Sequence, residues 1–185
     1  MYLNISNPTL THVTIANNTA DDGGGGMYLN NSNPTLTHVT IANNTADEGG
    51  GMLLVFSEPT LINSIIWSNS PESIYVYSAT PLITYSDIQG GWEGEGNIDS
   101  DPLFTDPEND DYTLKGDSPC IDAGIVVEGI EYIGSAPDMG AFEYECEEGY
   151  DCVGVCGGDA IEDACGICGG TNDCLRYPSE YIGQW

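Results

Sequence analysis

The first half of the chain repeats itself. Residues 1–26 read MYLNISNPTLTHVTIANNTADDGGGG and residues 27–51 read MYLNNSNPTLTHVTIANNTADEGGG, so two nearly identical segments follow each other at a spacing of 26 residues. A third, diverged copy covers residues 52–72 and a fourth covers residues 73–90. Short repeats of this length are typical of stacked solenoids, because one unit cannot bury its own apolar side chains and must lay them on its neighbours.

Alignment of the copies places like residues in columns. The columns are Pro8, Pro34, Pro59 and Pro81; Leu10, Leu36, Leu61 and Ile83; Ile15, Ile41, Ile66 and Ile88; Leu3, Leu29 and Leu54; and Asn18, Asn44 and Asn69. Each apolar column is predicted to form one line of the core. The asparagine column is predicted to form a side-chain amide ladder inside a turn.

The repeat predicts strands and turns, and no helices. Its longest apolar segment, TLTHVTI, is rich in β-branched residues, and the stretches between are Asn-Pro, Asn-Asn-Thr and runs of glycine. No window shows the period of about 3.6 residues that an amphipathic helix requires. Strict alternation in TLTHVTI would turn its leucine and its valine to opposite faces, so we expect a bend near His12 and His38 that brings both inward.

The charge of the chain excludes several classes of partner. Two Lys and Arg residues stand against 30 Asp and Glu residues, which gives a net charge of −28. Such a surface repels nucleic acid and anionic lipid, because phosphates are bound by Lys and Arg. No segment approaches the ~20 apolar residues of a membrane-spanning helix. We therefore expect neither nucleic acid binding nor a membrane span.

Two observations bear on where the chain is found. No signal peptide is visible at its start, yet five of the seven cysteines fall between residues 152 and 174, which is typical of an oxidising compartment. Met1 also occupies the same repeat position as Met27 and Met52, in mid-solenoid. We therefore expect the chain to be a fragment, with further coils of the same longer protein on its N-terminal side.

Several motifs resemble known secreted proteins. NPTLTHVTIANNTADDGGGGMYL resembles the coils of secreted bacterial right-handed β-helix proteins of the pectin-lyase-like group. Residues 96–124, GNIDSDPLFTDPENDDYTLKGDSPCIDAG, and the motif APDMGAFEY at residues 136–144 resemble the terminal coil and cap of that group. Residues 145–174 resemble a Cys-Gly-Gly repeat appended to large secreted proteins of marine bacteria.

The resemblance implies an all-β fold, a right-handed parallel β-helix solenoid with an irregular disulfide-rich C-terminal tail. The expected divisions are coils over residues 1–90, an acidic terminal coil and cap over residues 91–144, and a Cys-Gly-rich tail over residues 145–185. It also implies an extracellular or cell-surface location.

The function expected is that of a structural or adhesive module whose partners are neutral polysaccharide or cell-surface components. The competing hypothesis is a polysaccharide lyase or glycoside hydrolase whose catalytic coils lie upstream. A lyase needs a base, often Arg or Lys, and the repeats contain neither. The acidic pairs Asp21-Asp22 and Asp47-Glu48 occupy equivalent repeat positions, whereas a catalytic site is normally unique. We therefore assign no catalytic residues to this chain.

Aromatic side chains suggest a route to sugar. Sugar rings present C–H faces that stack on aromatic rings, and a neutral polysaccharide tolerates an acidic surface. The candidate contacts cluster in the third and fourth repeats and beyond: Trp67, Tyr75, Tyr77, Tyr85 and Trp92. The alternative is that these rings pack in the core or across strands.

Two sets of residues suggest metal binding. The acidic loop contains Asp99, Asp101, Asp106, Glu108, Asp110 and Asp111, and carboxylate oxygens are the ligands that Ca²⁺ prefers. The alternative is a solvated acidic turn. His12 and His38 stand 26 residues apart at one repeat position. A metal pair is conceivable there, but a structural stack of like residues is favoured.

The cysteine segment favours disulfides over zinc or redox chemistry. Only Cys165 and Cys168 have the CxxC spacing of a zinc clamp, with no histidine nearby. Disulfides are expected in a small glycine-rich module with little core. The candidates are Cys146, Cys152, Cys156, Cys165, Cys168 and Cys174, and the sequence leaves their pairing open. Cys120 is left over and is expected to pack as a small apolar residue.

Overall fold

The computed structural model describes residues 1–146, 149, 151–153, 157–163 and 166–169. The chain divides into two compact units, Met1–Glu145 and Cys146–Trp185. The segments predicted as coils and cap both lie in the first unit. No helix among the described residues is long and apolar enough to cross a membrane.

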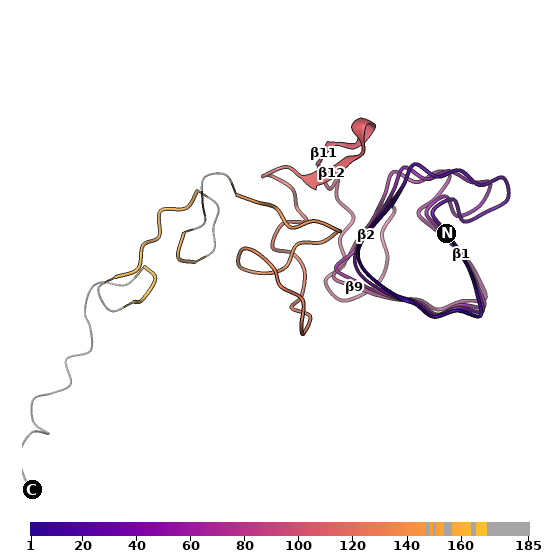
Figure 1. Ribbon diagram of the computed structural model, residues 1–185, viewed down its shortest axis with the longest axis horizontal. Coiled ribbons are helices and arrows are strands. Elements are labelled where there is room, and N and C mark those ends of the chain that lie inside the picture. Colours follow the sequence, from indigo (N-terminus) through magenta and orange to yellow (C-terminus); the bar gives the residue numbers. More distant parts are fainter. Residues whose placement is uncertain (147–148, 150, 154–156, 164–165, 170–185) are drawn as a thin grey trace, which may run out of the picture. The chain divides into compact units, whose positions relative to one another are not determined.

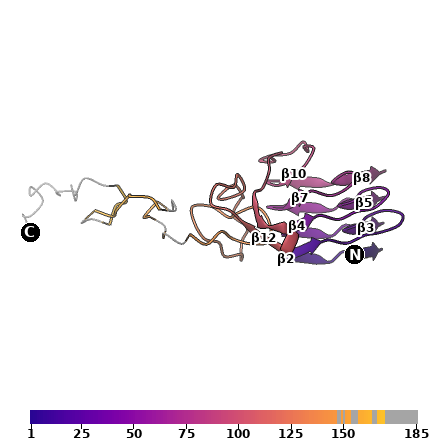
Figure 2. The same cartoon turned by 90° about the horizontal axis from the view of Figure 1, so that it is seen from above.

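The first unit is a stack of parallel coils, seen end-on in Figure 1 and from the side in Figure 2. One sheet contains β1 (Tyr2–Asn4), β3 (Met27–Asn30), β5 (Met52–Val55) and β8 (Ile74–Tyr77), in that order. The second contains β2 (Thr9–Ala16), β4 (Thr35–Ala42), β6 (Thr60–Ile62), β7 (Ile65–Trp67), β9 (Leu82–Thr84) and β10 (Asp87–Ile88). Each strand pairs in parallel with its equivalent in the next coil, which confirms the predicted β-solenoid.

The register confirms the apolar columns. Leu10 pairs with Leu36, Leu36 with Leu61, and Leu61 with Ile83. Ile15, Ile41, Ile66 and Ile88 form a second file in the same way. The side chains of Leu29, Leu36 and Leu54 have no exposed surface, so each coil closes the core of the one beside it.

A left-handed residue bends the second sheet at the predicted place. His12 and His38 both have φ of 52°. Leu36 and Val39, on either side of the bend in β4, are both fully buried, which strict alternation would not allow. In the third coil Asn63, with φ of 50°, separates β6 from β7 at the same position. The expected bend is therefore confirmed.

The asparagine column is the predicted amide ladder. Asn18 Nδ2 donates to Asn44 Oδ1 at 2.9 Å, and Asn44 Nδ2 donates to Asn69 Oδ1 at 3.0 Å. Asn44 Nδ2 also donates to the carbonyl of Ile15 at 2.9 Å. The ladder thereby supplies hydrogen bonds to backbone groups at the turn that have no partner in the sheets.

Two serine columns, which were not predicted from the sequence, also join neighbouring coils by hydrogen bonds at two other corners. The backbone N–H of Ser32 donates to Ser57 Oγ, and that of Ser64 donates to Ser86 Oγ, both at 3.0 Å.

The glycine runs are required where successive coils approach each other. A Cβ on Gly26 would lie 2.6 Å from the carbonyl oxygen of Gly51 and 2.8 Å from the side chain of Ile41. Since real Cβ atoms do not approach so closely, only glycine lets the turn pack against its neighbour.

Residues 91–98 extend the end of the coil stack. Trp92 packs against the apolar core, and Ile98 makes an isolated parallel bridge to Asp87. The chain then forms an antiparallel hairpin of β11 (Phe104–Asp106), a 3-10 turn (Pro107–Asn109) and β12 (Asp111–Leu114).

The flank segment, residues 104–145, lies along the side of the second sheet, where Figure 1 shows the hairpin beside β2. Ala141 N donates to Thr40 Oγ1 at 2.9 Å, and Gly140 N donates to the carbonyl of Asn63 at 2.9 Å. A second core cluster forms beneath it, from Ala42, Ile65, Phe104, Tyr112, Leu114, Cys120 and Met139. The segment expected as a cap thus mainly covers a side of the coils, reaching back to the first of them.

The second unit contains a disulfide between Cys152 and Cys168. Cys146 is disulfide-bonded as well. Cys156, Cys165 and Cys174 lie outside the described residues. Cys120, in the first unit, is a buried free thiol, as expected.

The amide ladder predicts an unequal response to two alanine substitutions. Asn44→Ala removes a fully buried amide that bonds to Asn18, to Asn69 and to the carbonyl of Ile15, and is expected to lower the free energy of unfolding by about 2–4 kcal/mol. Asn18→Ala, at the exposed end, is expected to cost less than about 1 kcal/mol. Chemical denaturation of both variants checks this. Equal losses would contradict the ladder's role.

Candidate functional site

An aromatic face covers the outer side of the first sheet. We use this name for Tyr2, Tyr28, Phe56, Tyr75 and Tyr77. Tyr2 pairs in register with Tyr28, and Tyr75 occupies the same column two coils further on. The rings of Tyr2 and Tyr28 lie edge to face at 5.2 Å, and those of Phe56 and Tyr77 at 5.7 Å. Tyr2, Phe56 and Tyr77 are each more than half exposed.

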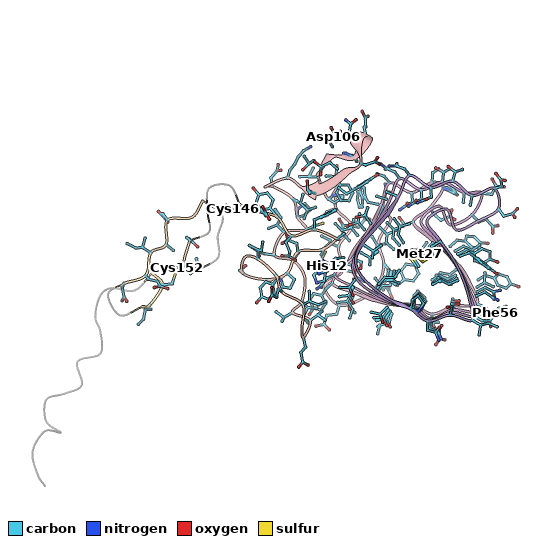
Figure 3. The ribbon with its side chains drawn as sticks, viewed as in Figure 1. His12, Met27, Phe56, Asp106, Cys146 and Cys152 are labelled. Carbon is cyan, nitrogen blue, oxygen red and sulfur yellow. A yellow bond between two sulfur atoms is a disulfide. The ribbon has the colours of Figure 1, made fainter. Side chains whose placement is uncertain are left out.

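Alternation along the strands explains why these rings face solvent. In β3 the side chains of Met27 and Leu29 point into the core, so Tyr28 between them points out. Figure 3 shows Met27 inside the coil outline and Phe56 outside it at one corner. The repeated MYLN motif carried this signal for Tyr2 and Tyr28, which the sequence analysis missed along with Phe56.

The five predicted sugar contacts separate into two groups. Tyr75 and Tyr77 lie on the aromatic face. Trp92 packs against the main core, whereas Trp67 and Tyr85 are partly buried against the second cluster. For Trp67, Tyr85 and Trp92, the alternative prediction of core packing therefore holds for much of each side chain. The structure does not bring the five rings together.

A cleft of about 410 Å³ lies between β7 and the hairpin of the flank segment. We call it the Trp67 cleft. Its other lining residues are Asn43, Ser68, Asp101, Leu103, Phe104, Thr105, Asp106, Pro107, Glu108 and Lys115. The cleft brings one predicted sugar contact together with three of the six residues predicted to bind calcium.

Five of the six predicted calcium ligands accept hydrogen bonds from the protein. Asp99 accepts from Gly90 N at 3.1 Å and Asp101 from Leu103 N at 3.0 Å. Asp106 accepts from Asn109 Nδ2, Asp110 from Asn17 Nδ2, and Asp111 from Thr113. Within the described residues, no three His, Cys, Asp or Glu side chains are grouped so that they could hold a metal ion. Calcium binding stays a prediction, without an assembled site at these six residues.

The two histidines stack, as the repeat indicates. Their rings are 5.0 Å apart and 18° from parallel. His38 is almost completely buried, and its Nε2 lies 3.1 Å from Asn63 Nδ2. Burial, with a smaller contribution from the charge of His12, lowers the pKa of His38 to about 4. His38 is therefore neutral at physiological pH, which fits the structural interpretation.

Comparison with known proteins supports the architecture. Residues 4–94 match the family described as right handed beta helix region. The coil region is a right-handed β-helix. No curated protein and no solved structure matches the chain. The family match ends near the last coil of the β-helix, before the flank segment.

Two buried carboxyl groups, which the sequence did not predict, order the flank segment: Asp87 contacts it from the last coil of the β-helix, and Asp138 lies within it. Asp87, in the last coil, is fully buried; it accepts from Ser100 N and from Cys120 Sγ, both at 3.2 Å. Asp138 accepts from Asp122 N at 2.7 Å and Tyr144 N at 2.6 Å. Burial raises the pKa of Asp87 to about 6 and that of Asp138 to about 7.

Because their pKa values are raised, Asp87 and Asp138 contribute less stability as pH rises, whereas His38, whose pKa is lowered, contributes more. The folded-state pKa of Asp87 is above its unfolded value of 3.8, so its contribution is complete below pH ~4 and is lost as pH passes about 6. The loss is on the order of 3 kcal/mol. Asp87→Asn should therefore show a smaller fall in melting temperature between pH 4 and pH 7 than the unmodified chain.

The exposed carboxylate variant Asp117→Asn is the matched control, and should keep the full fall. An Asp87→Asn variant whose melting temperature follows pH as steeply as that of the unmodified chain would contradict the role given to Asp87.

Proposed function

We propose that this chain is a structural and adhesive module of an extracellular or cell-surface protein, and that its aromatic face contacts neutral polysaccharide. The observation that carries the proposal is the exposure of Tyr2, Phe56, Tyr75 and Tyr77 on one side of one sheet. Exposed aromatic rings gathered on a rigid scaffold mark a binding surface.

The geometry of the face suits an extended ligand. Parallel coils repeat at about 4.8 Å, so the outward positions of the first sheet form columns at that spacing. Tyr28 and Tyr75 occupy one column, in which the buried Leu53 stands between them, and Tyr77 occupies a neighbouring column. A polymer of sugar rings can lie across several coils and stack its C–H faces on these rings.

Charge selects the kind of polysaccharide. The only Lys and Arg residues are Lys115 and Arg176, so the coils carry no cation that would attract a uronate or sulfate group. The loops beside the face carry Asp22 and Glu48, and Gly24 in the first of these loops lies against Tyr28. Carboxylates there accept hydrogen bonds from sugar hydroxyl groups, whereas they repel anionic glycans.

The proposal assigns no catalytic step to this chain. A polysaccharide lyase or glycoside hydrolase with its catalytic coils elsewhere remains the alternative hypothesis. Recovery of a longer reading frame that contains a coil with a unique Arg, Lys or paired-carboxylate cluster would favour that alternative.

Retention on insoluble polysaccharides tests the proposal. The intact chain is expected to bind at least one of cellulose, xylan and chitin, and not cross-linked polygalacturonate. The Tyr75→Ala/Tyr77→Ala variant is expected to bind at least about tenfold more weakly, a loss of roughly 1.4 kcal/mol. Tyr132→Ala, which removes an exposed tyrosine of the flank segment, is the matched control and should bind normally.

Circular dichroism and melting temperature establish that each variant is folded. Retention on none of the neutral polymers, or equal retention by the double variant and the unmodified chain, would refute the proposal.

A further inference from the structure

A repeat column changes its residue type at the Trp67 cleft. Ala16 pairs with Ala42, and Ala42 pairs with Trp67. The alanines leave no ring at this position in the first two coils, whereas the third coil presents an indole. Trp67 is only partly buried, packing against the second core cluster while also lining the cleft. Trp67 therefore marks a single position along the solenoid, whereas the repeated residues occur in several coils.

The hairpin of the flank segment supplies the opposite wall. Asp106 and Glu108 come from the hairpin, and Lys115 follows it directly. Among the described residues, the side chains of Glu108 and Lys115 make no hydrogen bond or ion pair, nor does the hydroxyl group of Ser68. The cleft therefore offers hydrogen-bond donors and acceptors that the protein itself does not use, next to an aromatic ring.

This combination indicates a class of ligand. A polyanion is disfavoured by three carboxylates against one ammonium group. A metal ion is disfavoured because the carboxylates are not grouped as ligands within the described part of the chain. A polyhydroxylated ring fits, because each hydroxyl group both donates and accepts, and because a sugar ring has an apolar face for the indole. The cleft volume of about 410 Å³ is at the lower end of the range for small-molecule sites.

We propose that the Trp67 cleft is a second saccharide site, which binds a single sugar residue of a neutral glycan. The site deepens the proposed function but stands on different residues. Phe56 of the aromatic face and Asp106 of the cleft wall lie on opposite sides of the coil outline in Figure 3. With two separate sites the module binds two glycan segments at once, which is the property that an adhesive cross-link requires.

Titration with monosaccharides tests the cleft alone, because one sugar is too short to need the extended aromatic face. The probes are glucose, galactose, mannose, xylose, N-acetylglucosamine and, as an anionic comparison, galacturonate. Binding to the intact chain is followed by saturation-transfer NMR and tryptophan emission. At least one neutral sugar is expected to bind saturably, more tightly than galacturonate.

The variants locate the binding. Trp67→Ala is expected to weaken it at least tenfold, and Glu108→Gln and Lys115→Met severalfold each. Both of the latter residues are exposed, so their substitution keeps the test valid even where Trp67→Ala lowers stability. The exposed Glu128→Gln is the matched control, and Tyr75→Ala/Tyr77→Ala should leave monosaccharide binding unchanged.

The results separate this proposal from the previous one. Monosaccharide binding that survives in the absence of polysaccharide retention would refute the role of the aromatic face and leave the cleft in place. Failure of every neutral sugar to bind saturably would overturn the cleft proposal. Binding that depends on Tyr75 and Tyr77, and not on Glu108 or Lys115, would overturn it equally.

Discussion

The structure depends on parallel, in-register stacking, which places equivalent side chains of successive coils directly over one another. Neighbouring coils place equivalent residues about 4.8 Å apart, so each column must be compatible with itself. Leucine and isoleucine columns satisfy this by burial, and asparagine does so because its amide both donates and accepts. A buried charge repeated at this spacing would repel its own copy. The histidine column shows the constraint, since burial and the neighbouring ring lower the pKa of His38 to about 4.

The same constraint explains how much of the coil region could be predicted from sequence. Two nearly identical repeats reveal which residues share a column, and Leu10, Leu36 and Leu61 do lie in register. The bend at His38 was predictable because alternation alone would expose either Leu36 or Val39. The outward position of Tyr28 follows from the same alternation. Tyr28 was not predicted as a sugar contact because it is the only Phe, Trp or Tyr residue of its repeat, whereas the diverged repeats contain several.

The flank segment and the Trp67 cleft could not be derived in this way, because no repeat guides that part of the chain. The hydrogen bond from Ala141 N to Thr40 Oγ1 joins residues 101 positions apart. The burial of Asp87 similarly depends on Cys120 and other residues far along the chain. The acidic composition of residues 99–111 suggested calcium, whereas the structure distributes these carboxylates among hydrogen bonds to other protein groups and one wall of a cleft. Tertiary contacts, not local sequence, give these residues their surroundings.

The most direct test of this account is disulfide trapping between coils. Thr9 pairs with Thr35 and Thr35 with Thr60, so Thr9 and Thr60 are separated by two coil spacings. A disulfide needs Cα atoms about 4.4–6.8 Å apart, and adjacent coils meet this at about 4.8 Å, whereas alternate coils, at about 9.6 Å, do not. The intact chain with Thr9→Cys and Thr35→Cys should therefore form the new disulfide, detected by peptide mass mapping, and the chain with Thr9→Cys and Thr60→Cys should not. Equal trapping of both pairs, or trapping of neither, would contradict the stacked β-helix.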